Sequence, residues 1–171
     1  MTFDPRTLAT PVYEALSQLR SPYDEAWNQM QSPSEKKVYY DHMKEQKNQA
    51  VELYTYLSTW GMMRLRAEEM ALDKPNKAKP GEPPPTLKKK AETSQEGKRE
   101  VIQAYFKCLG TLAKSEATKN LGGKDGLEVL KRLSTDEYLG VTGLGLALAQ
   151  EFSFWATAVY HDISGEDEYV A

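Results

Sequence analysis

The 171-residue chain has one cysteine and two histidines, so it lacks most of the side chains that bind metals or carry redox chemistry. The single Cys108 excludes an intrachain disulfide and a cysteine-rich zinc site, and its apolar neighbours predict a buried thiol. Neither His42 nor His161 follows a glutamate by three residues, so the paired Glu-x-x-His motifs of di-iron bundles are missing. We therefore expect no metal and no cofactor.

Catalytic motifs are also absent. The chain has no serine nucleophile elbow, no Walker motif and no zinc-finger spacing. Asp41-His42 and His161-Asp162 could form an acid–base pair if their helices met, but we favour a helix-surface position for both histidines. The protein is therefore predicted not to be an enzyme and to have no small-molecule substrate.

The start of the chain, MTFDPR, lacks the basic and apolar parts of a signal peptide. The most apolar stretch, EYLGVTGLGLALAQEFSFWA at 137–156, is interrupted by Gln150 and Glu151, which makes a membrane span unfavourable. We expect no membrane contact and a cytoplasmic location.

Composition and periodicity favour one helical domain spanning residues 1–171. Charged residues make up 27% and hydrophobic residues 40%, which is typical of a globular protein. Apolar residues recur at three- and four-residue steps, and no segment alternates as a strand would. The expected fold is an all-α, single-domain bundle of about five to six helices.

Prolines and capping patterns predict where the helices begin. Pro11, Pro22 and Pro33 each suit the first turn of a helix, and Ser32 to Glu35 form a possible capping box. One long helix is expected from there to about residue 72, with a kink at Gly61.

Later helices are predicted in the same way. Thr93 to Glu96 and Ser134 to Glu137 have the pattern of capping boxes. A short helix is expected at 124–133, and the final helix should run to about Asp162.

Residues 73–97 interrupt the helical pattern. Five of the nine prolines fall in this segment among lysines, and three of the prolines are consecutive. We predict an exposed, flexible basic linker within the domain, in which Lys88, Lys89 and Lys90 act as an electrostatic anchor for nucleic acid.

Charge is unevenly distributed along the chain, although the net charge is only −3. Residues 74–99 contain eight Lys or Arg against three Glu, whereas no Lys or Arg follows Arg132. Such asymmetry favours polar contacts between unlike surfaces, including head-to-tail contacts.

Gly140, Gly143 and Gly145 lie within the apolar stretch. A phosphate-binding loop would follow a strand, and none precedes these glycines. They are typical instead of a buried helix that another helix or subunit approaches closely. We assign these glycines and Trp155 to packing or to a subunit interface.

Aromatic and basic side chains interleave in YTYLSTWGMMRLRAEE, which contains Tyr54, Tyr56, Trp60, Arg64 and Arg66. Cations can hold a phosphate backbone while aromatic rings stack on bases, although such aromatics also commonly form core. The two arginines are two positions apart and should point in different directions on a helix.

The C-terminal half of the chain carries a family resemblance. It lies in the segments REVIQAYFKCLGTLAK and GLEVLKRL, followed by Asp136 to Leu139, Thr142, the run 144–149 and Trp155-Ala156. These features resemble the small all-helical subunit of type III-B CRISPR–Cas (Cmr) effector complexes. The upstream LYTYLSTWGMMRLRAEE is similar to an earlier helix of that family.

The resemblance implies a non-catalytic protein that stacks head-to-tail and lines the groove where guide RNA pairs with target RNA. Its partners would be other subunits of the effector complex, copies of itself, and guide and target RNA. The basic residues of the matching helices, which would hold the duplex backbone, are Arg64, Arg66, Lys107, Lys114, Lys131 and Arg132. The alternative is a helical protein–protein adaptor or assembly scaffold with no nucleic-acid role.

Overall fold

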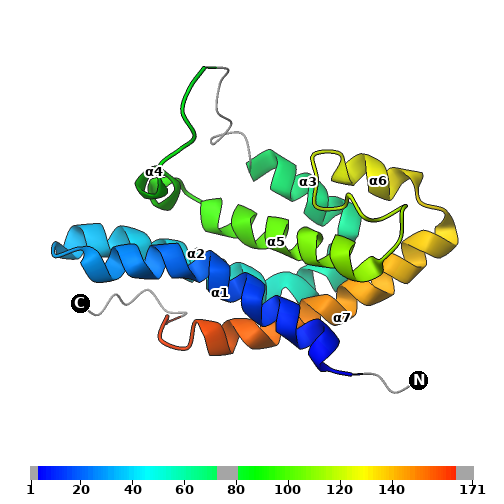
Figure 1. The fold of residues 1–171 in the computed structure, drawn as a ribbon, viewed down its shortest axis with the longest axis horizontal. Coiled ribbons are helices and arrows are strands. Elements are labelled where there is room, and N and C mark those ends of the chain that lie inside the picture. The colour runs from blue at the N-terminus through cyan, green and yellow to red at the C-terminus, as the bar shows by residue number, and fades with distance from the viewer. Residues whose placement is uncertain (1–3, 73–80, 165–171) are drawn as a thin grey trace.

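The computed structural model describes residues 4–72 and 81–164, and every regular element in these ranges is a helix (Figure 1). This confirms the predicted all-α bundle. The described helices are α1 (Arg6–Gln29), α2 (Pro33–Trp60), α3 (Met62–Leu72), α4 (Leu87–Glu92), α5 (Glu96–Ala113), α6 (Gly126–Arg132) and α7 (Thr135–Val159).

The helices form two layers, which we call the lower and upper layers after their places in Figure 1. The lower layer consists of α1, α2 and α7, which contact one another, and the upper layer consists of α5 with α3, α4 and α6 around it. Between the layers lies a core that includes Leu16, Leu53, Phe106 and Phe152, one from each of α1, α2, α5 and α7 and each at most 1% exposed. Burying a side chain of this kind contributes about 1.5–3 kcal/mol.

Pro11 and Pro22 do not begin helices, because both lie inside α1. A proline inside a helix removes one backbone hydrogen bond and costs about 3 kcal/mol or more. The burial of Val12 and Tyr23, which directly follow the two prolines, offsets this cost. Tertiary packing therefore overrides the local signal.

The predicted kink at Gly61 is a complete break between α2 and α3. Gly61 has a φ of 83°, in the left-handed region that favours glycine, and its N–H donates a 3.0 Å hydrogen bond to the carbonyl of Leu57. The long helix predicted to run to about residue 72 is thus two helices.

One of the three predicted capping boxes forms, at the start of α7. Ser134 Oγ accepts a bond from the Glu137 N–H, and the Glu137 carboxylate accepts one from the Ser134 N–H. Ser32 does precede Pro33 at the start of α2, but Ser32 Oγ pairs with Ser34 Oγ at 2.8 Å and makes no capping bond.

The predicted box at Thr93 is wrong because Thr93 ends α4, and its hydroxyl donates to the carbonyl of Lys89. Helix α5 begins at Glu96 and is capped from α2. The Glu45 carboxylate accepts bonds from the N–H groups of Gln95 and Gly97, at 3.1 and 3.2 Å. A cap supplied from another helix leaves no local sequence pattern.

The linker predicted at 73–97 agrees with the structure at 81–86, which are mostly exposed and form no helix, but is wrong from Leu87 onwards. Lys88, Lys89 and Lys90 belong to helix α4, which Thr86 caps by accepting a bond from the Lys89 N–H. The last residues of the predicted linker are also structured, since Gly97 is buried against α2. Residues 73–80 of the predicted linker lie outside the described residues.

The three glycines of α7 have different surroundings. A Cβ at Gly145 would lie 2.5 Å from Met62 Cε and 2.7 Å from the Tyr105 hydroxyl, so any other residue here would have to displace these side chains. Gly140 and Gly143 have no such neighbour within 4 Å. Close packing within this chain is therefore found at Gly145, whereas a subunit interface at Gly140 and Gly143 stays a prediction.

Trp155 is half-buried on the same helix. Its ring packs edge-on against Tyr13 at 5.7 Å, and its Nε1 donates to Glu151 at 2.9 Å. Despite the apolar character of α7, no helix in the described ranges is long and apolar enough to span a membrane.

Candidate nucleic-acid interface

The two layers carry opposite charge. The upper layer with its connecting loops, residues 62–72 and 81–133, has thirteen Lys or Arg against nine Asp or Glu, a net charge of +4. The lower layer, residues 4–60 and 134–164, has six against twelve, a net charge of −6. Folding thus gathers the uneven charge of the sequence on two sides of the molecule.

Most cations predicted to contact nucleic acid are exposed on the upper layer. Among the described residues, no carboxylate lies within 4.0 Å of the side chains of Arg64, Lys88, Lys89, Lys90, Lys107, Lys114 or Arg132. Lys131 is exposed as well and makes only a long contact of 3.5 Å with Glu128. Lys90 is half-buried and the others are exposed. These groups are available for phosphate contacts.

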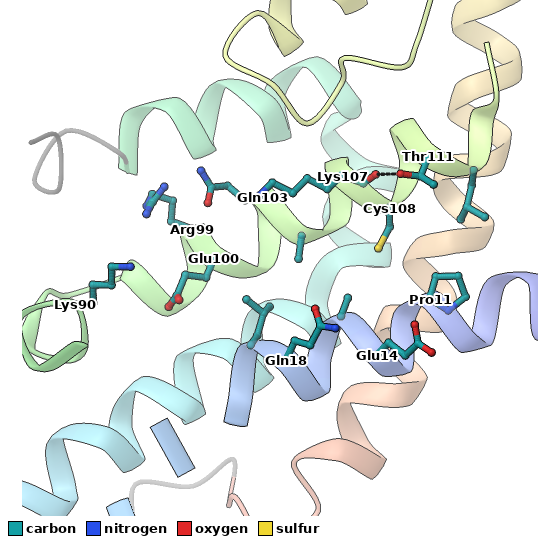
Figure 2. A pocket seen from close by; sticks show the side chains of 14 residues that line it. Pro11, Glu14, Gln18, Lys90, Arg99, Glu100, Gln103, Lys107, Cys108 and Thr111 are labelled. Carbon is teal, nitrogen blue, oxygen red and sulfur yellow. Dashed lines mark hydrogen bonds between the residues drawn. The ribbon is translucent and has the colours of Figure 1, made fainter. Parts of the chain in front are cut away.

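Part of this surface borders a groove between α1 and α5. The groove has a volume of about 490 Å³ (Figure 2). Arg99, Gln103, Lys107 and Thr111 lie four residues apart along α5 and line one side of it. Lys90 of α4 extends toward the groove from one end, and residues of α1, including Glu14 and Gln18, line the opposite side.

Cys108 also lines the groove. Cys108 is half-buried, whereas the sequence predicted a buried thiol, and this burial raises its pKa to about 11. At neutral pH it is therefore a protonated, weakly nucleophilic group.

Glu100 lines the groove and is held by two buried side chains. The Tyr23 hydroxyl donates to both carboxylate oxygens, at 3.0 and 3.1 Å, and His42 Nε2 contacts Oε1. Tyr23 and His42 also stack, with ring centroids 3.9 Å apart. This cluster joins α1, α2 and α5 beneath the groove.

The surface position predicted for His42 is wrong, since its side chain is fully buried. Sequence reasoning missed the partner, Glu100, because it is 58 positions away. His161 is exposed as predicted, with Nδ1 3.2 Å from the carbonyl of Ala158. The described part of the chain contains no group of three or more His, Cys, Asp or Glu placed to hold a metal ion.

Arg66 is not a surface cation, so its predicted role in nucleic-acid contact is wrong. It is 6% exposed, pairs with Glu69 on its own helix, and donates a 2.5 Å bond to the carbonyl of Gly123. Arg99 extends this ion-pair network through Glu96 at 2.5 Å and Glu69 at 4.0 Å. The network braces α3 against α5 and the loop before α6.

The three-residue spacing of each pair, Arg66 with Glu69 and Glu96 with Arg99, was a sequence signal for this network. The spacing could not show that the two pairs meet. Arg64 points away from the network, as predicted from its offset of two residues, and its guanidinium lies over the ring of Trp60.

In comparisons with known proteins, no family model, no curated protein and no solved structure matches this chain.

Proposed function

We propose that this protein is a non-catalytic small subunit of an RNA-guided CRISPR effector ribonucleoprotein, located in the cytoplasm. The exposed cations of the upper layer contact the backbone of the duplex between guide RNA and target RNA. The observation that carries the proposal is the separation of charge between layers, with a set of exposed lysines that have no acidic partner in the described chain.

Backbone contacts suit such a surface because phosphates attract lysine and arginine irrespective of base sequence. The unlike charges of the two layers support head-to-tail stacking of copies, because such contacts join unlike surfaces. The resemblance of the C-terminal half to the type III-B small subunit supports the same assignment.

The test is binding of a blunt-ended RNA duplex to the full chain at several salt concentrations. Changing Lys88, Lys89 and Lys107 to Glu should weaken binding by at least about tenfold and make it less sensitive to salt, because each lost phosphate contact lowers the slope by about 0.7–0.9. The matched control changes Arg6, Lys36 and Lys37 of the lower layer to Glu, with the same change in net charge. Equal losses for both variants would refute a specific basic face.

A second candidate function is a protein–protein adaptor without nucleic acid. Leu139 and Phe154 on α7 are each 63% exposed, and Gly140 and Gly143 leave space beside that helix. Exposed apolar groups of this kind favour a protein partner. Copurification of partners that survives nuclease treatment, together with a chain that retains no RNA, would favour the adaptor.

A further inference from the structure

Trp60 forms an exposed aromatic surface at the break between α2 and α3. It is the last residue of α2 and is 53% exposed. The guanidinium carbon of Arg64, on the first turn of α3, lies 4.0 Å from the centroid of the indole ring. The guanidinium covers one face of the ring at contact distance. Trp60 nevertheless remains 53% exposed, so much of its ring is accessible to solvent.

The surroundings of this pair leave the cation available. Tyr56, Ala67 and Glu68 complete a shallow depression of about 480 Å³ around Trp60 and Arg64. Burial and the nearby Glu68 carboxylate raise the pKa of Tyr56, and Glu68 itself faces Lys98 at 3.9 Å. Within the described ranges, no carboxylate lies within 4.0 Å of Arg64.

An exposed indole beside a guanidinium that has no carboxylate within 4.0 Å in the described ranges matches the two parts of a nucleotide. Bases stack on tryptophan whatever their sequence, and the N–H groups of arginine donate to phosphate oxygens. A protein partner could also bury Trp60, but the exposed cation Arg64, which has no carboxylate within 4.0 Å in the described ranges, favours an anionic ligand.

We propose that Trp60 and Arg64 form a stacking site for one unpaired nucleotide of an RNA strand. The base lies on the exposed part of the indole, and the adjoining phosphate accepts hydrogen bonds from Arg64. This inference rests on the proposed nucleic-acid role and adds recognition of an unpaired base to backbone contacts with a duplex.

Tryptophan fluorescence tests the site directly, because a stacked base quenches the indole. We expect single-stranded oligoadenylate to quench the full chain. Trp60→Ala should remove most of the quenching and weaken binding by about tenfold, as expected for the loss of one stacked base. Trp60→Phe should restore most of the affinity. Arg64→Lys, which keeps the charge but not the planar group, should bind less tightly than the unchanged chain.

The matched control is Trp155→Phe. Trp155 is half-buried in α7 with its indole N–H bonded to Glu151, so its replacement should leave oligoadenylate affinity unchanged. Far-UV circular dichroism checks that each variant is folded. Unchanged affinity and quenching in Trp60→Ala would overturn the stacking site. So would loss of a copurifying protein partner without any change in oligoadenylate binding.

Binding of the blunt-ended duplex distinguishes a failure of the stacking site from a failure of the proposed duplex role. If duplex binding depends on Lys88, Lys89 and Lys107 while oligoadenylate leaves Trp60 unquenched, the stacking site fails and the duplex role stands. If oligoadenylate quenches Trp60 but the duplex does not bind, the stacking site stands and the duplex role fails.

Discussion

The hydroxyl group of Tyr105 on α5 donates a 2.8 Å hydrogen bond to the carbonyl of Gly145 on α7. The same hydroxyl would lie 2.7 Å from a Cβ at position 145, where Met62 is closer still. The hydrogen bond therefore depends on the absence of a side chain at position 145, because α5 and α7 can approach this closely only at a glycine.

Alanine substitution should change the stability of the protein in opposite directions at Gly145 and at Gly143. Gly145→Ala must push Met62 or Tyr105 aside, and we expect it to lower the free energy of unfolding by about 1–3 kcal/mol. Gly143→Ala has open space and should raise it by up to about 1 kcal/mol, because alanine favours the helix. Urea denaturation of both variants measures the difference. A Gly145→Ala protein as stable as the parent would contradict the packing described here.

The buried tyrosines should make the fold sensitive to alkaline pH. Burial raises the pKa values of Tyr105 and Tyr160 far above the ordinary value of 10.0. Above pH 10 the unfolded chain releases these protons while the folded chain retains them, so stability is complete below that pH and falls as pH rises. Each such tyrosine contributes a slope of about 1.4 kcal/mol per pH unit.

The measurement is urea denaturation between pH 9 and pH 11.5, with Tyr105→Phe compared with the parent. The variant should lose less stability across this range, since it has one fewer proton to release on unfolding. Tyr13→Phe is the control, because Tyr13 is 50% exposed. Equal pH slopes for all three proteins would rule out the linkage.

The same substitution should destabilise the fold far more at Arg66 than at Arg64. Arg66→Met leaves Glu69 buried with a weakened set of partners, and we expect it to destabilise the fold by about 3–5 kcal/mol. Arg64→Met removes an exposed cation over Trp60 and should cost about 1 kcal/mol or less. Thermal or chemical denaturation of the two variants gives the comparison, and similar losses would contradict the assignment of Arg66 to a buried network.

Glu45 should stabilise α5 from a distance. Glu45→Ala removes the acceptor for the N–H groups of Gln95 and Gly97 and should lower the free energy of unfolding by about 1–2 kcal/mol. Glu52→Ala, an exposed substitution on the same helix, is the control and should change stability little. Hydrogen exchange at the first turn of α5 should accelerate in Glu45→Ala alone.

Local signals in the sequence were sufficient for the helical content of this protein. The periodicity of apolar residues, Pro33 at the start of α2, Gly61 at its end and the Ser134 capping box all act within a few residues, and each is found in the structure. The prolines of α1 were misleading because packing of Val12 and Tyr23 outweighs the local cost.

Only part of the candidate interface could be predicted from the sequence. The lysines near residue 90 and Lys107 could be identified as cations, but their position on one layer required the fold. Arg66 and Arg64 are indistinguishable by residue type, and only the Arg66 side chain meets Glu69 and Gly123 in the interior. Glu100 carried no signal because its partners, Tyr23 and His42, are distant in the chain.

The sequence by itself thus determined the class of fold and some helix boundaries, such as the starts of α2 and α7, since helix formation depends on neighbours three and four residues apart. Only the tertiary structure decided which charges are buried, which glycines are packed and which face is basic. Those properties depend on groups brought together from distant parts of the chain, where burial changes the energy of a charge and contact determines the space available.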